Sequence, residues 1–201
     1  MQNDETPDGQ DDDPRLGPPD GIVLFAIAFE GALVLVALAL GWLFGINPFA
    51  QMTADFAAVA NGLFATAPLL LVLWWGLQQR SGAIGRVTGQ AARMSHQFFA
   101  NASLAELMLV ALAAGFGEEA LFRGFLQPLF AHVGGDIVGL VLASIAFGLA
   151  HAMSREYAIV AGVIGLYLGW LYLATGNLMV PIVTHAAYDL VALLWLRRVS
   201  V

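Results

Sequence analysis

The sequence contains no cysteine and no lysine, and these two absences exclude several kinds of chemistry. Without cysteine there can be no disulfide bond, no zinc site built on thiolates and no cysteine nucleophile. All eight basic residues are arginine, so neither a Schiff-base lysine nor a serine–lysine pair can operate. The sequence also lacks the stripe of basic residues that nucleic-acid binding requires. We therefore expect no nucleic-acid partner.

Charged residues of any kind are scarce. They make up 11% of the 201 residues, whereas soluble domains average about a quarter. Hydrophobic residues account for 59%, and the mean hydropathy is +0.76. The apolar residues fall in runs long enough to cross a bilayer, which takes roughly 20 residues per helix. These properties predict an integral membrane protein.

The charges are also unevenly distributed. Seven of the fifteen acidic residues lie within residues 1–20, which are rich in proline and glycine and poor in large apolar side chains. Such a composition cannot bury enough surface to offset its ordering entropy. We predict a disordered acidic tail over 1–20 and a transmembrane domain over 21–201. The tail is not a signal peptide, because it lacks a basic start followed by a short apolar run.

The apolar runs predict an all-α fold, a polytopic transmembrane bundle of about six helices. The expected spans are 22–46, 56–77, 103–130, 137–153, 157–175 and 178–196. Residues 78–102 differ, because three arginines alternate there with glycines and with a loosely helical apolar face. This segment is either an amphipathic helix on the membrane surface or a basic loop.

The arginines predict the orientation of the bundle. With the N-terminus inside, every arginine outside a helix faces the cytoplasm, as the positive-inside rule requires. The opposite loops, around 47–55, 131–136 and 175–177, contain no arginine. We therefore predict cytoplasmic N- and C-termini in a bacterial-type inner or plasma membrane.

Ionisable residues inside predicted spans are the candidates for a functional site, because they cost free energy in lipid unless they are paired. Glu119 and Arg123 are four residues apart and should stack on one helical face. Glu118 points about 100° away on the same helix, free for another role. The remaining candidates lie at the end of the fourth span and within the sixth: His151, His185 and Asp189. We expect these side chains to converge on one interior cavity, where a carboxylate beside imidazoles could serve as a general base.

Simpler interpretations exist for these residues. Glu119 and Arg123 could form a purely structural ion pair, and a single buried histidine often only links two helices. Glu30 in the first span and Glu106 at the start of the third are expected to be snorkelling or pathway residues rather than catalytic ones.

Three motifs in this order resemble a known family. Glu118 to Arg123 reads EExxxR, Phe147 to His151 reads FxxxH, and His185 to Asp189 reads HxxxD. This pattern is similar to that of the CPBP family, which includes the type II CAAX prenyl endopeptidases and the bacteriocin-processing or Abi proteins. The resemblance covers about residues 103–196. It implies a glutamate-dependent intramembrane peptidase that cuts a protein or peptide substrate near the membrane.

The resemblance also implies roles for the site residues. Glu118 would activate water with His151, His185 and Asp189 would stabilise the oxyanion, and Glu119 with Arg123 would hold the first carboxylate in place. Prenyl-protein processors often have asparagine at the position of Asp189. Because an ionised aspartate cannot donate a hydrogen bond, Asp189 could instead orient His185.

Several alternatives stay open at this point. Glu118, His151 and His185 could supply a zinc site with two histidines and one carboxylate, although the HExxH signature is absent and a metal-free mechanism is favoured. A proton-coupled transporter would use similar residues, but no inverted repeat is evident. A non-enzymatic scaffold or immunity protein of the same fold is the third alternative. The expected spans also place His151 near the inner face and His185 near the outer start of its helix, a mismatch in depth that a tilted span or irregular backbone at 179–181 would relieve.

Overall fold

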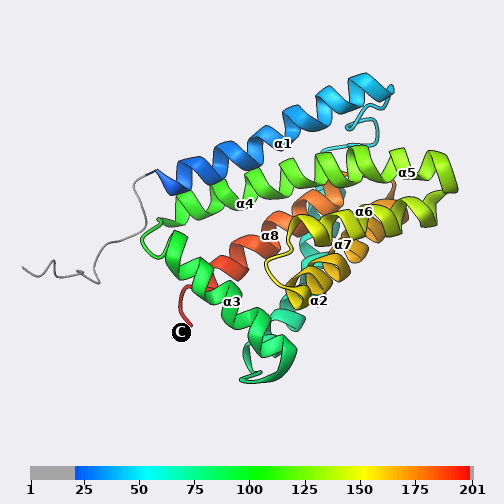
Figure 1. The fold of residues 1–201 in the computed structure, drawn as a ribbon. Helices are drawn as coiled ribbons and strands as arrows, with labels where there is room; N and C mark the ends of the chain where they lie inside the picture. The colour runs from blue at the N-terminus through cyan, green and yellow to red at the C-terminus, as the bar shows by residue number, and fades with distance from the viewer. Residues whose placement is uncertain (1–20, 200–201) are drawn as a thin grey trace, which may run out of the picture.

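The computed structural model describes residues 21–199, and within this range the chain is helical without any strand (Figure 1). The predicted acidic tail, residues 1–20, lies outside the described residues. The elements in chain order are α1 (Ile22–Phe44), α2 (Phe56–Leu77), α3 (Gly82–Phe99), α4 (Leu104–Glu119), the π-helix η1 (Ala120–Leu126), α5 (Gln127–Gly134), α6 (Asp136–Ala150), α7 (Arg155–Thr175) and α8 (Met179–Leu196).

Four of the described helices are long and apolar enough to cross a membrane: α1, α2, α7 and α8. The two other expected spans correspond to the continuous helical run from α4 through α5 and to α6, which is apolar but only 15 residues long. Large apolar side chains such as those of Phe25, Trp42 and Phe64 are exposed on the outside of the bundle. A water-soluble protein would bury much of this surface. The all-helical membrane bundle is therefore confirmed, whereas the count of six and the orientation stay predictions.

Residues 82–99 form a helix, so the segment is not a basic loop. Its place on the membrane surface stays a prediction. Figure 1 shows α3 near one end of the bundle, beside the last residues of α8. Its buried Ala92 packs with Leu73 of α2 and with Ala192 and Leu196 of α8. Arg86 and Arg93 are exposed. The helix thus buries its apolar face against the bundle and leaves its arginines outside.

The helix that carries the first motif begins with a capping box. The Ser103 hydroxyl accepts a hydrogen bond from the Glu106 backbone, and the Glu106 carboxylate accepts one from the Ser103 backbone. Two otherwise unpaired amide groups are thereby satisfied at the helix start. The helical run continues to Gly134, four residues beyond the expected end.

The π-helix interrupts this run at Ala120–Leu126, directly after the two glutamates. Pro128 follows it at the start of α5. Proline has no amide hydrogen to donate to the carbonyl four residues earlier, and its ring crowds the preceding turn. This crowding accounts for a widened turn before Pro128, and π-turns of this kind are frequent at functional sites.

Two glycines let α4 approach its neighbours closely. A Cβ atom at Gly115 would lie 2.8 Å from Cβ of Ala186 on α8. A Cβ atom at Gly117 would overlap the carbonyl oxygen of Glu30 on α1. Small residues at helix crossings are the usual route to close packing in membranes. The residues that follow, Glu118 and Glu119, are therefore held between α1 and α8.

Candidate active site

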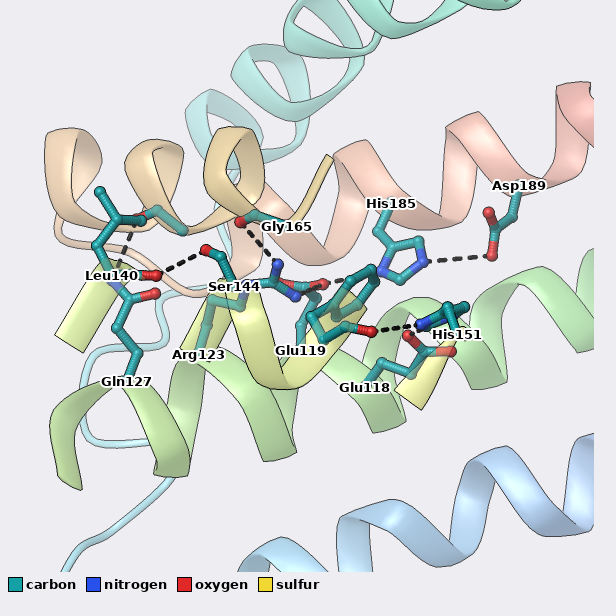
Figure 2. A network of polar contacts seen from close by, with 12 residues as sticks. Glu118, Glu119, Arg123, Gln127, Leu140, Ser144, His151, Gly165, His185 and Asp189 are labelled. Atoms are coloured by element: carbon teal, nitrogen blue, oxygen red, sulfur yellow. Dashed lines mark hydrogen bonds and ion pairs between the residues drawn. The ribbon is translucent and has the colours of Figure 1, made fainter. Parts of the chain in front are cut away.

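The centre of the site is a buried hydrogen-bond network around Glu119 (Figure 2). Arg123 donates from Nη1 to Oε1 of Glu119 over 2.7 Å and from Nη2 to the carbonyl of Gly165 on α7 over 2.9 Å. Nδ1 of His185 on α8 lies 2.8 Å from the same Oε1 atom. The Glu119 and Arg123 side chains are fully buried. The predicted pairing of these two residues is confirmed, and it links α4, η1, α7 and α8.

His185 lies between two carboxylates. An ionised Glu119 can only accept a hydrogen bond, so Nδ1 of His185 carries the hydrogen of this contact. The opposite ring nitrogen, Nε2, is 3.4 Å from Oδ2 of Asp189, one turn further along α8. The ring is therefore held at both nitrogens.

His151 is held in the same manner at the end of α6. Nδ1 lies 2.9 Å from the Phe147 carbonyl oxygen, which can only accept, so Nδ1 carries the hydrogen. Nε2 is thereby left to face Oε2 of Glu118 at 3.6 Å. Oε2 of Glu118 is buried and makes no hydrogen bond within the described part of the chain. Glu118 and His151 thus present a carboxylate oxygen and an imidazole nitrogen side by side.

The ring of Phe147 separates and supports these groups. Its centroid is 4.5 Å from the His151 ring, which it stacks on, and 5.9 Å from the His185 ring. The Arg123 guanidinium carbon also lies over the Phe147 ring, 4.5 Å from the ring centroid. Phe147 is itself buried. The first residue of the FxxxH motif therefore sets the spacing between the two histidines and the arginine.

Exposure increases from one end of the site to the other. The Glu119 side chain is 0% exposed and that of His185 is 6% exposed. The side chains of Asp189 and His151 are 29% and 30% exposed. The site is therefore open on the side of His151 and Asp189, while Glu119 and Arg123 stay sealed behind it. The predicted convergence of the six candidate residues is what the structure shows.

The expected mismatch in depth between His151 and His185 does not occur. With 15 residues, α6 is about 22 Å long, which is less than the roughly 30 Å of the hydrocarbon core. A helix this short need not extend to the inner face, so His151 can lie at the depth of His185. The irregular backbone suggested for residues 179–181 is absent, because α8 begins at Met179 and includes Pro181 in its first turn.

The zinc alternative meets a geometric difficulty. Within residues 21–199, no three His, Asp or Glu side chains are arranged so that they could hold a metal ion together. Glu118, His151 and His185 are neighbours, and the Nδ1 contacts of both histidines leave Nε2 as the nitrogen of each ring that can take another partner. The metal-free mechanism stays a prediction.

The sequence did not predict the environment of two side chains, those of Gln127 and Glu30. Gln127 is buried one helical turn beyond Arg123 and donates from Nε2 to the Gly169 carbonyl over 3.2 Å, which repeats the contact of Arg123 with Gly165 (Figure 2). Gln127 lies four residues after Arg123, and this spacing could have indicated that both side chains lie on the same face of the helix. Glu30 of α1 was expected to be a snorkelling or pathway residue. Its Oε2 atom is buried and makes no hydrogen bond within the described residues, which argues against snorkelling and leaves the pathway role a prediction.

The fold and the site together define a helical integral membrane protein whose ionisable residues meet in its interior. Residues 100–191 match the model of the Rce1-like family of type II CAAX prenyl endopeptidases, which confirms the resemblance carried by the three motifs. The family model is that of type II CAAX prenyl endopeptidases. All three motifs lie within the matched residues.

The chain is 28% identical over 165 residues to the uncharacterized protein YpbD of Bacillus subtilis (strain 168), covering 70% of this chain and 83% of the relative. No solved structure matches the chain.

Proposed function

We propose that the protein is an intramembrane endopeptidase that hydrolyses a peptide bond of a membrane-associated protein or peptide. The observation that carries this proposal is the 3.6 Å approach of Glu118 Oε2 to His151 Nε2 on the open side of the site. A water molecule touching both atoms would donate one hydrogen bond to each. The family match to type II CAAX prenyl endopeptidases supports the same class of reaction.

In the proposed reaction, Glu118 takes a proton from this water as the hydroxide oxygen bonds to the scissile carbonyl carbon. The carbonyl π electrons move to oxygen and form an oxyanion. Collapse of this intermediate re-forms the C=O bond and breaks the C–N bond, and Glu118 returns its proton to the leaving nitrogen. His151 orients the water through Nε2, because its Nδ1 hydrogen is committed to Phe147. A positioned acid–base group of this kind contributes about 10²–10⁴-fold in rate.

His185 is the proposed oxyanion partner. Glu119 fixes its Nδ1 hydrogen, and Asp189 faces its Nε2 atom. A hydrogen on Nε2 would therefore point towards the open side, where Asp189 and the oxyanion both lie. Asp189 orients this ring and does not donate to the oxyanion itself, in keeping with the departure from asparagine at this position.

The test is a substrate trap followed by a cleavage assay. The Glu118→Gln variant is purified from native membranes, co-purifying peptides are identified by mass spectrometry, and each is offered to the wild type in nanodiscs. We expect a trapped peptide to be cut by the wild type and not by Glu118→Gln. The Glu106→Gln variant is the matched control, because Glu106 lies on the same helix but is exposed at its start, and it should cleave normally.

Two results would contradict the proposal. Proton flux into liposomes that Glu118→Gln abolishes, without any peptide cleavage, would indicate the proton-coupled transporter. Genetic complementation that survives Glu118→Ala and His151→Ala would indicate the non-enzymatic scaffold or immunity protein.

A further inference from the structure

Arginine is concentrated at one end of the bundle, the end where α3 lies (Figure 1). Of the seven arginines in the described residues, Arg123 is buried in the site and the others surround α3. These six are Arg80, Arg86, Arg93, Arg155, Arg197 and Arg198. The acidic residues on the surface of this end are Glu106 and Glu156, whereas the opposite end carries Asp55 and Asp136 and, among the described residues, no arginine. The α3 end therefore has a large excess of positive charge.

α3 lies at the level where the apolar helices end. Its Ala92 packs with Leu73 near the end of α2 and with Leu196, the last residue of α8. Arg86 forms an ion pair of 2.6 Å with Glu156 in the first turn of α7. α3 is thus in contact with three apolar helices at the points where their apolar sequences stop.

Two tryptophans mark the same level independently. Trp74 and Trp75 lie in the last turn of α2 and are 56% and 49% exposed on the outside of the bundle. Exposed tryptophans of membrane proteins are enriched where the hydrocarbon meets the headgroups. α3 follows α2 after a short connection that contains Arg80, so the arginines around α3 lie at the depth of the lipid phosphates.

Two arginines of α3 have donors to spare. Arg86 and Arg93 are seven residues apart, which is two helical turns, so they point to the same side of α3. The Arg86 side chain is 64% exposed even with Glu156 as its partner. Arg93 is exposed, and its guanidinium makes no hydrogen bond or ion pair with another residue between 21 and 199. A guanidinium offers a planar pair of donors that matches the oxygens of a phosphate group.

We propose that the outer face of α3, through Arg86 and Arg93, binds the headgroups of anionic phospholipids. The charge of this face and its depth both point to that partner. The phosphate of phosphatidylcholine is balanced by its own choline, so the arginines should select lipids whose headgroup has a net negative charge. The inference is independent of the proposed peptidase reaction, because it uses none of the residues of the site.

The test uses the absence of cysteine from the chain. Gln97→Cys places one fluorescent label on the exposed side of α3, one turn after Arg93. Ala54→Cys places the same label on an exposed residue of the opposite end as the matched control. The full-length protein is reconstituted in phosphatidylcholine nanodiscs that contain a small, equal amount of spin-labelled phosphatidylglycerol or spin-labelled phosphatidylcholine. Quenching of the fluorescence then measures how often each lipid lies beside the label.

We expect phosphatidylglycerol to be enriched over phosphatidylcholine by about fivefold beside Gln97→Cys, the scale of one arginine at an anionic lipid surface. No enrichment is expected beside Ala54→Cys. Arg93→Gln should remove most of the enrichment and Arg93→Lys should retain most of it, because the lysine keeps the charge. Arg93 has no partner in the described residues whose loss would disturb the fold, so this variant stays informative even if Arg86→Gln folds poorly.

Four results would overturn the proposal. Equal quenching by the two lipids beside Gln97→Cys would show that α3 does not select anionic lipid, and equal enrichment at both labels would show that the effect is not local. Enrichment that survives Arg93→Gln combined with Arg86→Gln would exclude these arginines. Glycerol phosphate that removes the enrichment more effectively than sodium chloride of equal ionic strength would indicate a site for soluble anions. Enrichment that appears only after the acids of residues 1–20 are neutralised would mean that this acidic segment, and not lipid, occupies the face.

Discussion

Oε1 of Glu119 lies 2.8 Å from Nδ1 of His185, and this contact joins the first motif on α4 to the third motif on α8. The same oxygen accepts a hydrogen bond from Arg123 over 2.7 Å. One fully buried carboxylate therefore holds both the arginine and the histidine in place. The second glutamate of the EExxxR motif organises the site, while the first, Glu118, faces its open side.

Removing one member of the buried ion pair should destabilise the fold. Glu119→Ala leaves Arg123 without its carboxylate, and Arg123→Ala leaves Glu119 without its guanidinium, at an expected cost of about 3–5 kcal/mol each. The free energy of unfolding in mild detergent is the measurement. The double variant should cost less than the sum of the single ones, because it leaves no unpaired charge. Additive costs would show that the two residues act independently.

Glu118→Gln should separate activity from stability. The amide has the size of the carboxylate but cannot take a proton from water, so we expect cleavage to fall by about 10²–10⁴-fold. The unfolding temperature should stay close to that of the wild type, because Oε2 of Glu118 makes no hydrogen bond within the described residues. Cleavage rates and thermal unfolding of the same preparation test both parts. Retained cleavage would remove Glu118 from the reaction.

Phe147→Leu should impair the site through the positions of its neighbours. Leucine fills most of the space but cannot stack on the His151 ring or cover the guanidinium of Arg123, contacts that lie at 4.5 Å in each case. We expect kcat to fall by about tenfold with little change in KM, which corresponds to about 1.4 kcal/mol of transition-state stabilisation. Steady-state kinetics test this, and Phe122→Leu serves as the packing control, because the Phe122 ring packs edge-on against Phe147 at a centroid distance of 5.0 Å. An equal loss in both variants would mean that only packing is at stake.

Gly117→Ala should separate α1 from α4. The new methyl group would overlap the Glu30 carbonyl, and overpacking of this kind costs about 1–3 kcal/mol. Gly31→Ala is the matched control, since no atom outside its own helix lies within 4 Å of a Cβ atom there. That change should be neutral or stabilising by up to about 1 kcal/mol. Thermal unfolding of both variants gives the comparison, and an unaltered Gly117→Ala protein would disprove the close contact.

Chelators should leave the proposed cleavage unaffected. The proposed reaction uses Glu118 and His151 directly, and the described residues do not form a metal site. Purified protein is treated with phenanthroline or EDTA, and its activity and metal content are measured together. Activity that follows zinc occupancy would replace the metal-free mechanism with a metal-dependent one.

The sequence alone predicted most of the helices and the six polar residues that the structure brings together. Long apolar runs form helices in a membrane because every backbone group must be paired within the segment, so α2 at 56–77 was predicted to the residue. Spacings of four place side chains on one face of a helix, so the contacts of Glu119 with Arg123 and of His185 with Asp189 followed from their positions. The ends of the helical run from α4 through α5 were predicted less accurately, because the π-helix before Pro128 has only a weak local signal in the sequence.

What the tertiary structure decided was which residues meet between helices. No spacing within the chain indicates that Glu119 bonds to His185 or that Phe147 lies beside His185 and Arg123. These contacts depend on how closely the helices approach and at what height, and both are set by packing at small residues such as Gly115 and Gly117. Local sequence therefore determined the helices and the polar residues they carry, while helix packing determined the arrangement in which those residues can act together.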